Sequence, residues 1–171
     1  MNEKVLKTLE YHKILSQLSE YAFSDTAKKR CLSLRPITDR GQIELLQLQT
    51  KDALSRLFRC GSLSFSGVHD VTESLKRLAI GGTLSASELL SICSLLEAAK
   101  RAKAFSRSEK EDVPDDSLTS FFTEIAPLTP LYDEIRRCII ADDEIADDAS
   151  STLRSIRRSM RGMNDKIRAQ M

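Results

Sequence analysis

The sequence predicts a mostly all-α fold, in which an irregular helical bundle core carries a protruding long helix at its C-terminal end. Helix breakers are rare, with 6 Gly and 4 Pro in 171 residues, whereas Leu, Ala, Glu, Lys, Arg and Ser are abundant. Hydrophobic residues make up 41% of the chain, enough for a core, and they recur with helical spacing. The length fits one domain, or one domain with an appendage.

Capping signals and periodicity place the elements of the first two thirds of the chain. Residues 4–11 alternate loosely and predict a short strand or a helical lead-in. Asp39 followed by Gln42, and Ser85 followed by Glu88, have the spacing of a capping box. We expect helices over residues 12–21, 24–34, 39–61, 70–78 and 85–105.

The last third alternates between acidic segments and helices. Residues 106–117 predict a polar, acidic linker, and two short helices follow at 118–125 and 131–140, separated by Pro127 and Pro130. A second acidic cluster at 142–148 precedes a helix that starts near Ser150 or Ser151. The predicted domains are a helical core (1–107), an acidic linker with short helices that complete the core (108–149), and the first part of a long helix (150–171).

The final helix carries an apolar stripe with heptad spacing. Its members follow one another at gaps of 3, 4, 3 and 4 residues: Leu153, Ile156, Met160, Met163 and Ile167. This helix-pairing seam is still running at Met171, so we expect the chain to be an N-terminal fragment whose seam pairs with a later helix. The alternative is a last helix that packs back on the core.

The same helix is strongly basic, with one acid, Asp165, among its later residues. The candidate nucleic-acid-binding residues are Arg154, Arg157, Arg158, Arg161, Lys166 and Arg168. The alternative is a solvated flank of a coiled coil that pairs with acids on a partner helix. No aromatic residues interleave the basic positions, so stacking on single-stranded bases is not indicated.

The sequence predicts no catalytic residue and no metal site. The phosphate-loop pattern GxxxxGK[ST] is absent, and His12 and His69 have no nucleophile beside them. The four cysteines form no CxxC pair, and the acidic cluster at 142–148 lacks the glycine and terminal glutamate of a calcium loop. The net charge of +1 forces no partner, and the lack of a signal peptide or long apolar run predicts a cytoplasmic protein without a membrane partner.

Three segments resemble one family in their order and spacing: Thr8–Asp25, Arg77–Ile92 and Glu144–Met160. Nearly the full chain resembles the N-terminal region of the bacterial MutS-related proteins of the second branch, the MutS-like ATPases without a mismatch-reading domain. The last segment is the most specific, and it resembles the family's acidic strand-turn and entry to a long helix. Phe122-Thr123-Glu124 matches the Phe-x-Glu motif of mismatch readers, but its helical context predicts coincidence.

The resemblance implies a helical core followed by a lever and the start of a clamp. The full-length protein is expected to be a homodimeric ATPase that uses ATP and Mg, with a possible C-terminal endonuclease domain; no cofactor is expected in this chain. The family is linked to branched DNA, recombination suppression and rescue of collided ribosomes, and it is related to mismatch repair. The predicted function is therefore a non-catalytic core and lever that relays the ATPase state to a clamp. Its expected partners are the remainder of the protein, branched or duplex DNA, or the ribosome. The alternative is a coiled-coil protein-interaction module that does not bind nucleic acid.

Overall fold

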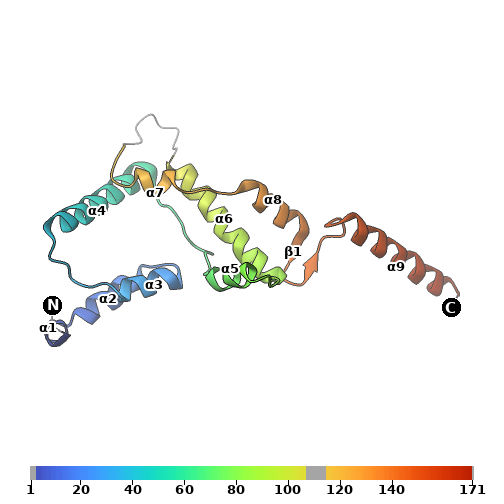
Figure 1. Cartoon of the computed structure of the whole chain (residues 1–171). Helices are drawn as coiled ribbons and strands as arrows, with labels where there is room; N and C mark the ends of the chain where they lie inside the picture. Colours follow the sequence, from blue (N-terminus) through green and yellow to red (C-terminus); the bar gives the residue numbers. More distant parts are fainter. Residues whose placement is uncertain (1–2, 107–114, 171) are drawn as a thin grey trace. The chain divides into compact units, whose positions relative to one another are not determined.

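The computed structural model describes residues 3–106 and 115–170, which contain nine helices and one two-stranded sheet (Figure 1). The helices are α1 (Glu3–Thr8), α2 (Tyr11–Glu20), α3 (Asp25–Leu32), α4 (Arg40–Cys60), α5 (Thr72–Ala79), α6 (Ala86–Ser106), α7 (Thr119–Thr123), α8 (Thr129–Cys138) and α9 (Ser151–Gln170). The mostly all-α prediction is confirmed, and the first segment is a helical lead-in rather than a strand. No helix within the described ranges is both long and apolar enough to cross a membrane.

Short polar side chains start the helices where the sequence predicted. The Oδ1 atom of Asp39 accepts a hydrogen bond from the backbone N–H of Gln42 at 2.7 Å, which caps α4. At α6 the capping box is reciprocal. The Glu88 N–H donates to Ser85 Oγ at 3.3 Å, and the Ser85 N–H donates to Glu88 Oε2 at 2.9 Å.

The two glycines after α5 form a tight C-terminal cap. The Gly81 N–H donates to the carbonyl of Leu78 and the Gly82 N–H donates to the carbonyl of Arg77, each at 2.9 Å, and Gly81 has a φ of 83°. A Cβ atom on Gly82 would lie 2.9 Å from the Arg77 carbonyl oxygen, so no side chain fits there without movement. The two glycines thus form the turn that leads from α5 toward α6.

The region between α7 and α9 differs from the prediction in two details. Helix α8 begins at Thr129, so Pro130 lies in its first turn and does not separate the helices. Proline is accommodated there because the first N–H groups of a helix have no intrahelical partner. Helix α8 ends at Cys138, and β1 (Ile139–Ala141) pairs antiparallel with β2 (Glu144–Ile145), which is the strand-turn that the resemblance implied.

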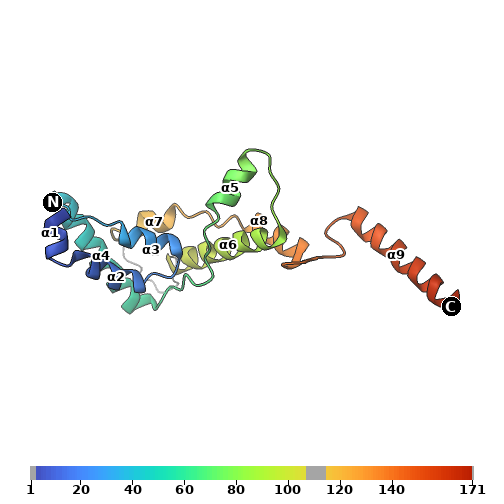
Figure 2. The same ribbon diagram turned by 90° about the horizontal axis from the view of Figure 1, so that it is seen from below.

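The chain divides into two compact units, and α6 contributes to both. Unit 1 comprises Met1–Asp70 and Ser94–Pro127, and unit 2 comprises Val71–Cys93 and Leu128–Met171. Within unit 1, α2 packs beside α3 (Figure 1, Figure 2). The buried apolar side chains of unit 1 are Leu6, Leu15, Leu96, Ala98 and Ala102, and those of unit 2 are Val71, Ile92, Cys93, Ile135, Ile139 and Ala146. The predicted domain boundaries at 107 and 149 stay predictions.

Unit 1 contains a buried ion pair that the sequence did not predict. The Arg56 guanidinium donates to both carboxylate oxygens of Asp116, at 2.7 and 2.6 Å, and to Thr119 Oγ1 at 2.9 Å. It lies 5.0 Å above the ring of Phe122, which itself packs against Phe105 at 5.8 Å between centroids. Phe122 therefore has a packing role.

The neighbouring Phe121, in contrast, is 56% exposed.

Candidate nucleic-acid interface

The end of α8 fixes the backbone that leads into α9. The Arg137 guanidinium forms two hydrogen bonds with the Glu134 carboxylate, at 2.6 and 3.0 Å, one turn earlier on the same helix. The same group donates to the carbonyl of Asp148 at 2.9 Å and to that of Ala149 at 3.3 Å. The hydrogen bonds between the two side chains raise the pKa of Arg137 and lower the pKa of Glu134, and the attraction between the two charges adds to both shifts.

A serine cap starts α9 where the sequence predicted. The Ser150 Oγ atom accepts a hydrogen bond from the Leu153 N–H at 3.1 Å. Asp147 and Asp148 lie just before the cap, where negative charge is favourable at a helix N-terminus.

The same two acids also reach the side of α9. Arg157 and Arg161, one turn apart, both form ion pairs with the Asp147 carboxylate. Arg157 also donates to the Ile145 carbonyl at 2.8 Å, and Arg154 lies 3.6 Å from the Asp148 carboxylate. We call Asp147, Arg157 and Arg161 the Asp147 clasp. The hydrogen bond from Arg157, followed by the one from Arg161, lowers the pKa of Asp147.

The other three predicted cations lie farther along the helix. Arg158, Lys166 and Arg168 are exposed, and none of them forms an ion pair with another described residue. The six predicted cations therefore fall into two groups, three compensated by Asp147 and Asp148 and three available to an external anion.

Four of the five residues of the predicted helix-pairing seam are exposed in the described structure, and Leu153 is half-buried. Ile156, Met160, Met163 and Ile167 are 52%, 58%, 64% and 57% exposed, and no residue of α9 is buried. Pairing of this seam with a later helix stays a prediction, and so does the alternative of a last helix that packs back on the core.

The two stripes occupy different faces of α9. At 3.6 residues per turn, successive residues are rotated by about 100°. The seam then lies about 150° around the helix from the line through Arg154, Arg158 and Arg161. One partner helix could cover the seam while the basic face stays open to another ligand.

The sequence identified the basic residues but missed what compensates them. Asp147 lies 10 and 14 residues from the two arginines it pairs with. Its position before the cap predicted only a favourable interaction with the helix dipole. No spacing in the sequence indicates that the side chains of two arginines extend back along the first turns of α9 to reach it.

Comparison with known proteins identifies the relatives of the chain. It is 58% identical over all of its 171 residues to the Endonuclease MutS2 of Agathobacter rectalis, 48% identical to that of Lachnoclostridium phytofermentans and 43% identical to that of Lachnospira eligens. It spans only about a fifth of these proteins, 22%, 22% and 21% of their lengths. No protein-family profile matches the chain. The resemblance drawn from the sequence is confirmed: the chain matches the N-terminal fifth of proteins named Endonuclease MutS2.

Proposed function

We propose that this chain is the non-catalytic core and lever region of a MutS-like DNA-binding ATPase, and that α9 carries the nucleic-acid contact. The observation that carries this proposal is the set of exposed cations on α9, three of which form no ion pair with a described acid, beside an exposed apolar seam. In this proposal the seam pairs with a clamp helix, and the basic face follows the phosphate backbone. The relay of the ATPase state would pass from the core through the hairpin and the Asp147 clasp into α9.

The activities of the full-length protein belong to this proposal as well. The relatives are named endonucleases, and we propose that ATP and Mg binding, homodimer formation and any nuclease activity lie outside these 171 residues. DNA or the ribosome, in a bacterial cytoplasm, would be the target of the assembled protein. The chain itself would supply binding and positioning only.

Three of the six cations on α9 are available to bind phosphate. Arg158, Lys166 and Arg168 are exposed and pair with no acid among residues 3–106 and 115–170, so they can bind phosphate without breaking a pair seen there. Arginine also fits phosphate oxygens in a forked geometry. Contacts of this kind position a duplex without reading its sequence, so binding should be equal for unrelated sequences.

The experiment is a salt titration of binding to duplex and branched DNA, followed by fluorescence anisotropy. The triple variant Arg158→Ala, Lys166→Ala, Arg168→Ala should lower the slope of log affinity against log salt by about 2.7, or about 0.9 for each phosphate contact. The matched control removes three other exposed cations that form no ion pair with another described residue, with Lys51→Ala, Arg59→Ala and Lys100→Ala. Equal losses in the two variants would reduce the effect to net charge and remove α9 from the proposal.

A second candidate function rests on the seam alone. An exposed apolar stripe at heptad spacing is suited to pairing with another helix, and the flanking charges would then only set its orientation. Light scattering would detect a dimer of this chain that persists in high salt and is lost in Ile156→Ser, Met163→Ser. A monomer that binds DNA would favour the first function.

A further inference from the structure

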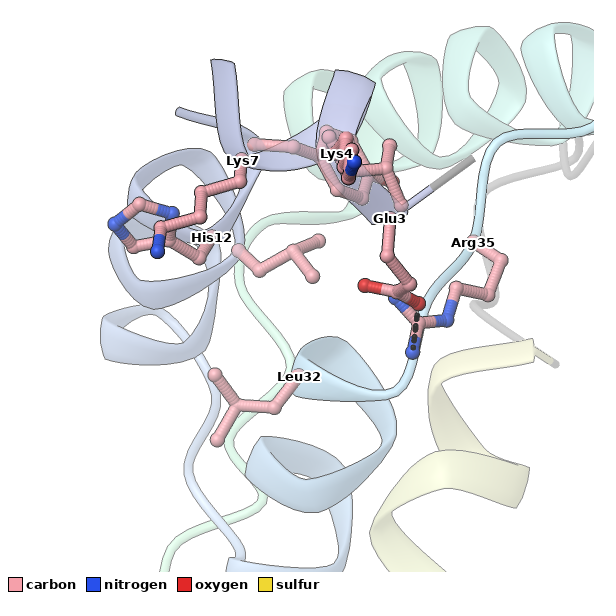
Figure 3. Close-up of a pocket in the computed structure, with 9 residues that line it drawn as sticks. Glu3, Lys4, Lys7, His12, Leu32 and Arg35 are labelled. Carbon is pink, nitrogen blue, oxygen red and sulfur yellow. Dashed lines mark ion pairs between the residues drawn. The ribbon is translucent and has the colours of Figure 1, made fainter. Parts of the chain in front are cut away.

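Unit 1 contains a pocket that the proposed function does not use. It lies among α1, α2 and the end of α3, with a volume of about 520 Å³ (Figure 3). This volume is within the range of about 300–1,000 Å³ that is typical of ligand sites. The pocket shares no residue with α9, so its role can be tested separately.

The floor of the pocket is made of leucines. Leu6 and Leu15 are buried, 6% and 7% exposed, and they come from the inner faces of α1 and α2. Leu32, at the end of α3, also lines the pocket but is 52% exposed. An apolar side chain of a ligand could therefore pack against Leu32 and remove its exposed apolar surface from water.

The rim of the pocket is cationic. Lys4, Lys7 and Arg35 carry three positive charges against one acid, Glu3, and Arg35 already pairs with that acid at 3.2 Å. In the view of Figure 3, Lys7 and His12 lie toward one edge and the Glu3–Arg35 pair toward the opposite edge. A ligand that spans the pocket therefore meets Lys7 at one end and, at the other, an arginine that it would share with Glu3, while the rim as a whole keeps an excess of two positive charges.

We propose that this pocket binds an acidic peptide segment of a partner protein, which inserts one apolar side chain against Leu15 and Leu32. Carboxylates on either side of that anchor would lie near Lys7 and Arg35. Charge complementarity favours the acids, and the leucine floor favours the apolar anchor. The phosphate backbone of nucleic acid meets only the first requirement, because it offers the leucines no apolar group.

The probe is a displayed peptide library with a fixed pattern of two acids, a variable residue, an apolar residue, a variable residue and two acids. A second library replaces every acid by its amide. We expect the purified chain to enrich peptides from the acidic library only. Enrichment of both libraries, or of neither, would overturn the proposal.

Variants then locate the site for an enriched, fluorescently labelled peptide. Lys7→Glu should weaken binding by about fivefold or more, since it replaces an attraction at the rim by a repulsion. Lys29→Glu, an equal charge change on α3 outside the pocket, should leave binding nearly unchanged.

Two further measurements separate the peptide from other ligands. Leu32→Ser should also weaken binding, because it removes the apolar wall. Equal effects of the two lysine variants, or no effect of Leu32→Ser, would reduce the interaction to general attraction between charges. Displacement of the peptide by duplex DNA would show a phosphate site and contradict the proposal.

Discussion

Replacing Asp116 by asparagine should destabilise unit 1 by about 3 kcal/mol. The pair that this change breaks is almost fully enclosed, with 2% of the Arg56 side chain and 8% of the Asp116 side chain exposed. Asparagine keeps the size of the side chain and can still accept the hydrogen bond that the Leu118 N–H gives to Asp116 at 2.9 Å. It removes the negative charge, so the Arg56 guanidinium stays buried without its counter-ion.

The magnitude follows from the contacts that remain. Removing one partner of a buried pair costs about 3–5 kcal/mol because the other charge is left uncompensated. Arg56 keeps the Thr119 hydroxyl at 2.9 Å and the face of Phe122 at 5.0 Å, so we expect the lower end of this range. Thermal unfolding monitored by circular dichroism should show a drop in Tm of about 6–12 °C, at 2–4 °C for each kcal/mol in a chain of this size.

A matched exposed pair provides the control. Glu44→Gln breaks the pair between Arg40 and Glu44 on α4, whose side chains are 91% and 61% exposed, and should cost less than about 1 kcal/mol. If Asp116→Asn is no more destabilising than this control, the argument from burial is wrong.

The pH dependence gives the same prediction a second test. The hydrogen bond from Arg56 is the main cause that lowers the pKa of Asp116 in the folded protein. The contribution of ionised Asp116 to stability is therefore complete above the pKa that Asp116 has in the unfolded chain, and it is lost as the pH falls through the pKa of Asp116 in the folded protein. The difference in stability between wild type and Asp116→Asn should shrink over that acidic window.

Three smaller predictions follow from the turn, the cap and the clasp. Gly82→Ala should lower the Tm, because the added Cβ atom would lie 2.9 Å from a backbone oxygen. In the same melting assay Gly162→Ala should stabilise α9 by about 1 kcal/mol, because its added Cβ atom would have no atom within 4 Å and alanine favours a helix over glycine. Hydrogen bonds from the Ser85 N–H, first of all, and from Ser74, the Ser85 hydroxyl and Arg77 lower the pKa of Glu88 from 4.5 to about 2. Ionised Glu88 should therefore stabilise α6 fully above its unfolded pKa and lose this effect as the pH falls through about 2, and Glu88→Gln should remove that titration from the amide NMR shift of Ser85. Asp147→Asn should strengthen DNA binding and steepen its salt dependence, since it releases two arginines; an unchanged affinity in anisotropy would contradict the proposed phosphate contact.

The helix starts could be predicted because their physical cause is local. A cap needs only a short polar side chain and an N–H group two or three residues later, so Asp39 with Gln42 and Ser85 with Glu88 are visible in the sequence. The same locality explains the ends at Gly61 and Gly81, where positive φ values favour glycine.

The buried pair in unit 1 could not be predicted in this way. Arg56 and Asp116 are 60 residues apart, and on its own helix Arg56 looks like any other surface arginine. Only the packing of α4 against the segment before α7 brings the two charges together and excludes water from them. The family resemblance did not supply this contact either, since neither residue lies in the three segments that carry it.

The candidate interface combines both situations. The heptad seam and the basic stripe depend only on spacing within α9, so the sequence predicted them. The net charge around the basic stripe, however, also depends on residues that precede α9. The hairpin returns Asp147 and Asp148 to the side of the helix, where they compensate Arg154, Arg157 and Arg161. A count of six cations therefore overstates the field that DNA would meet over the first turns. The stronger field lies from Arg158 toward the C-terminal end, and footprints of bound phosphate should be found there.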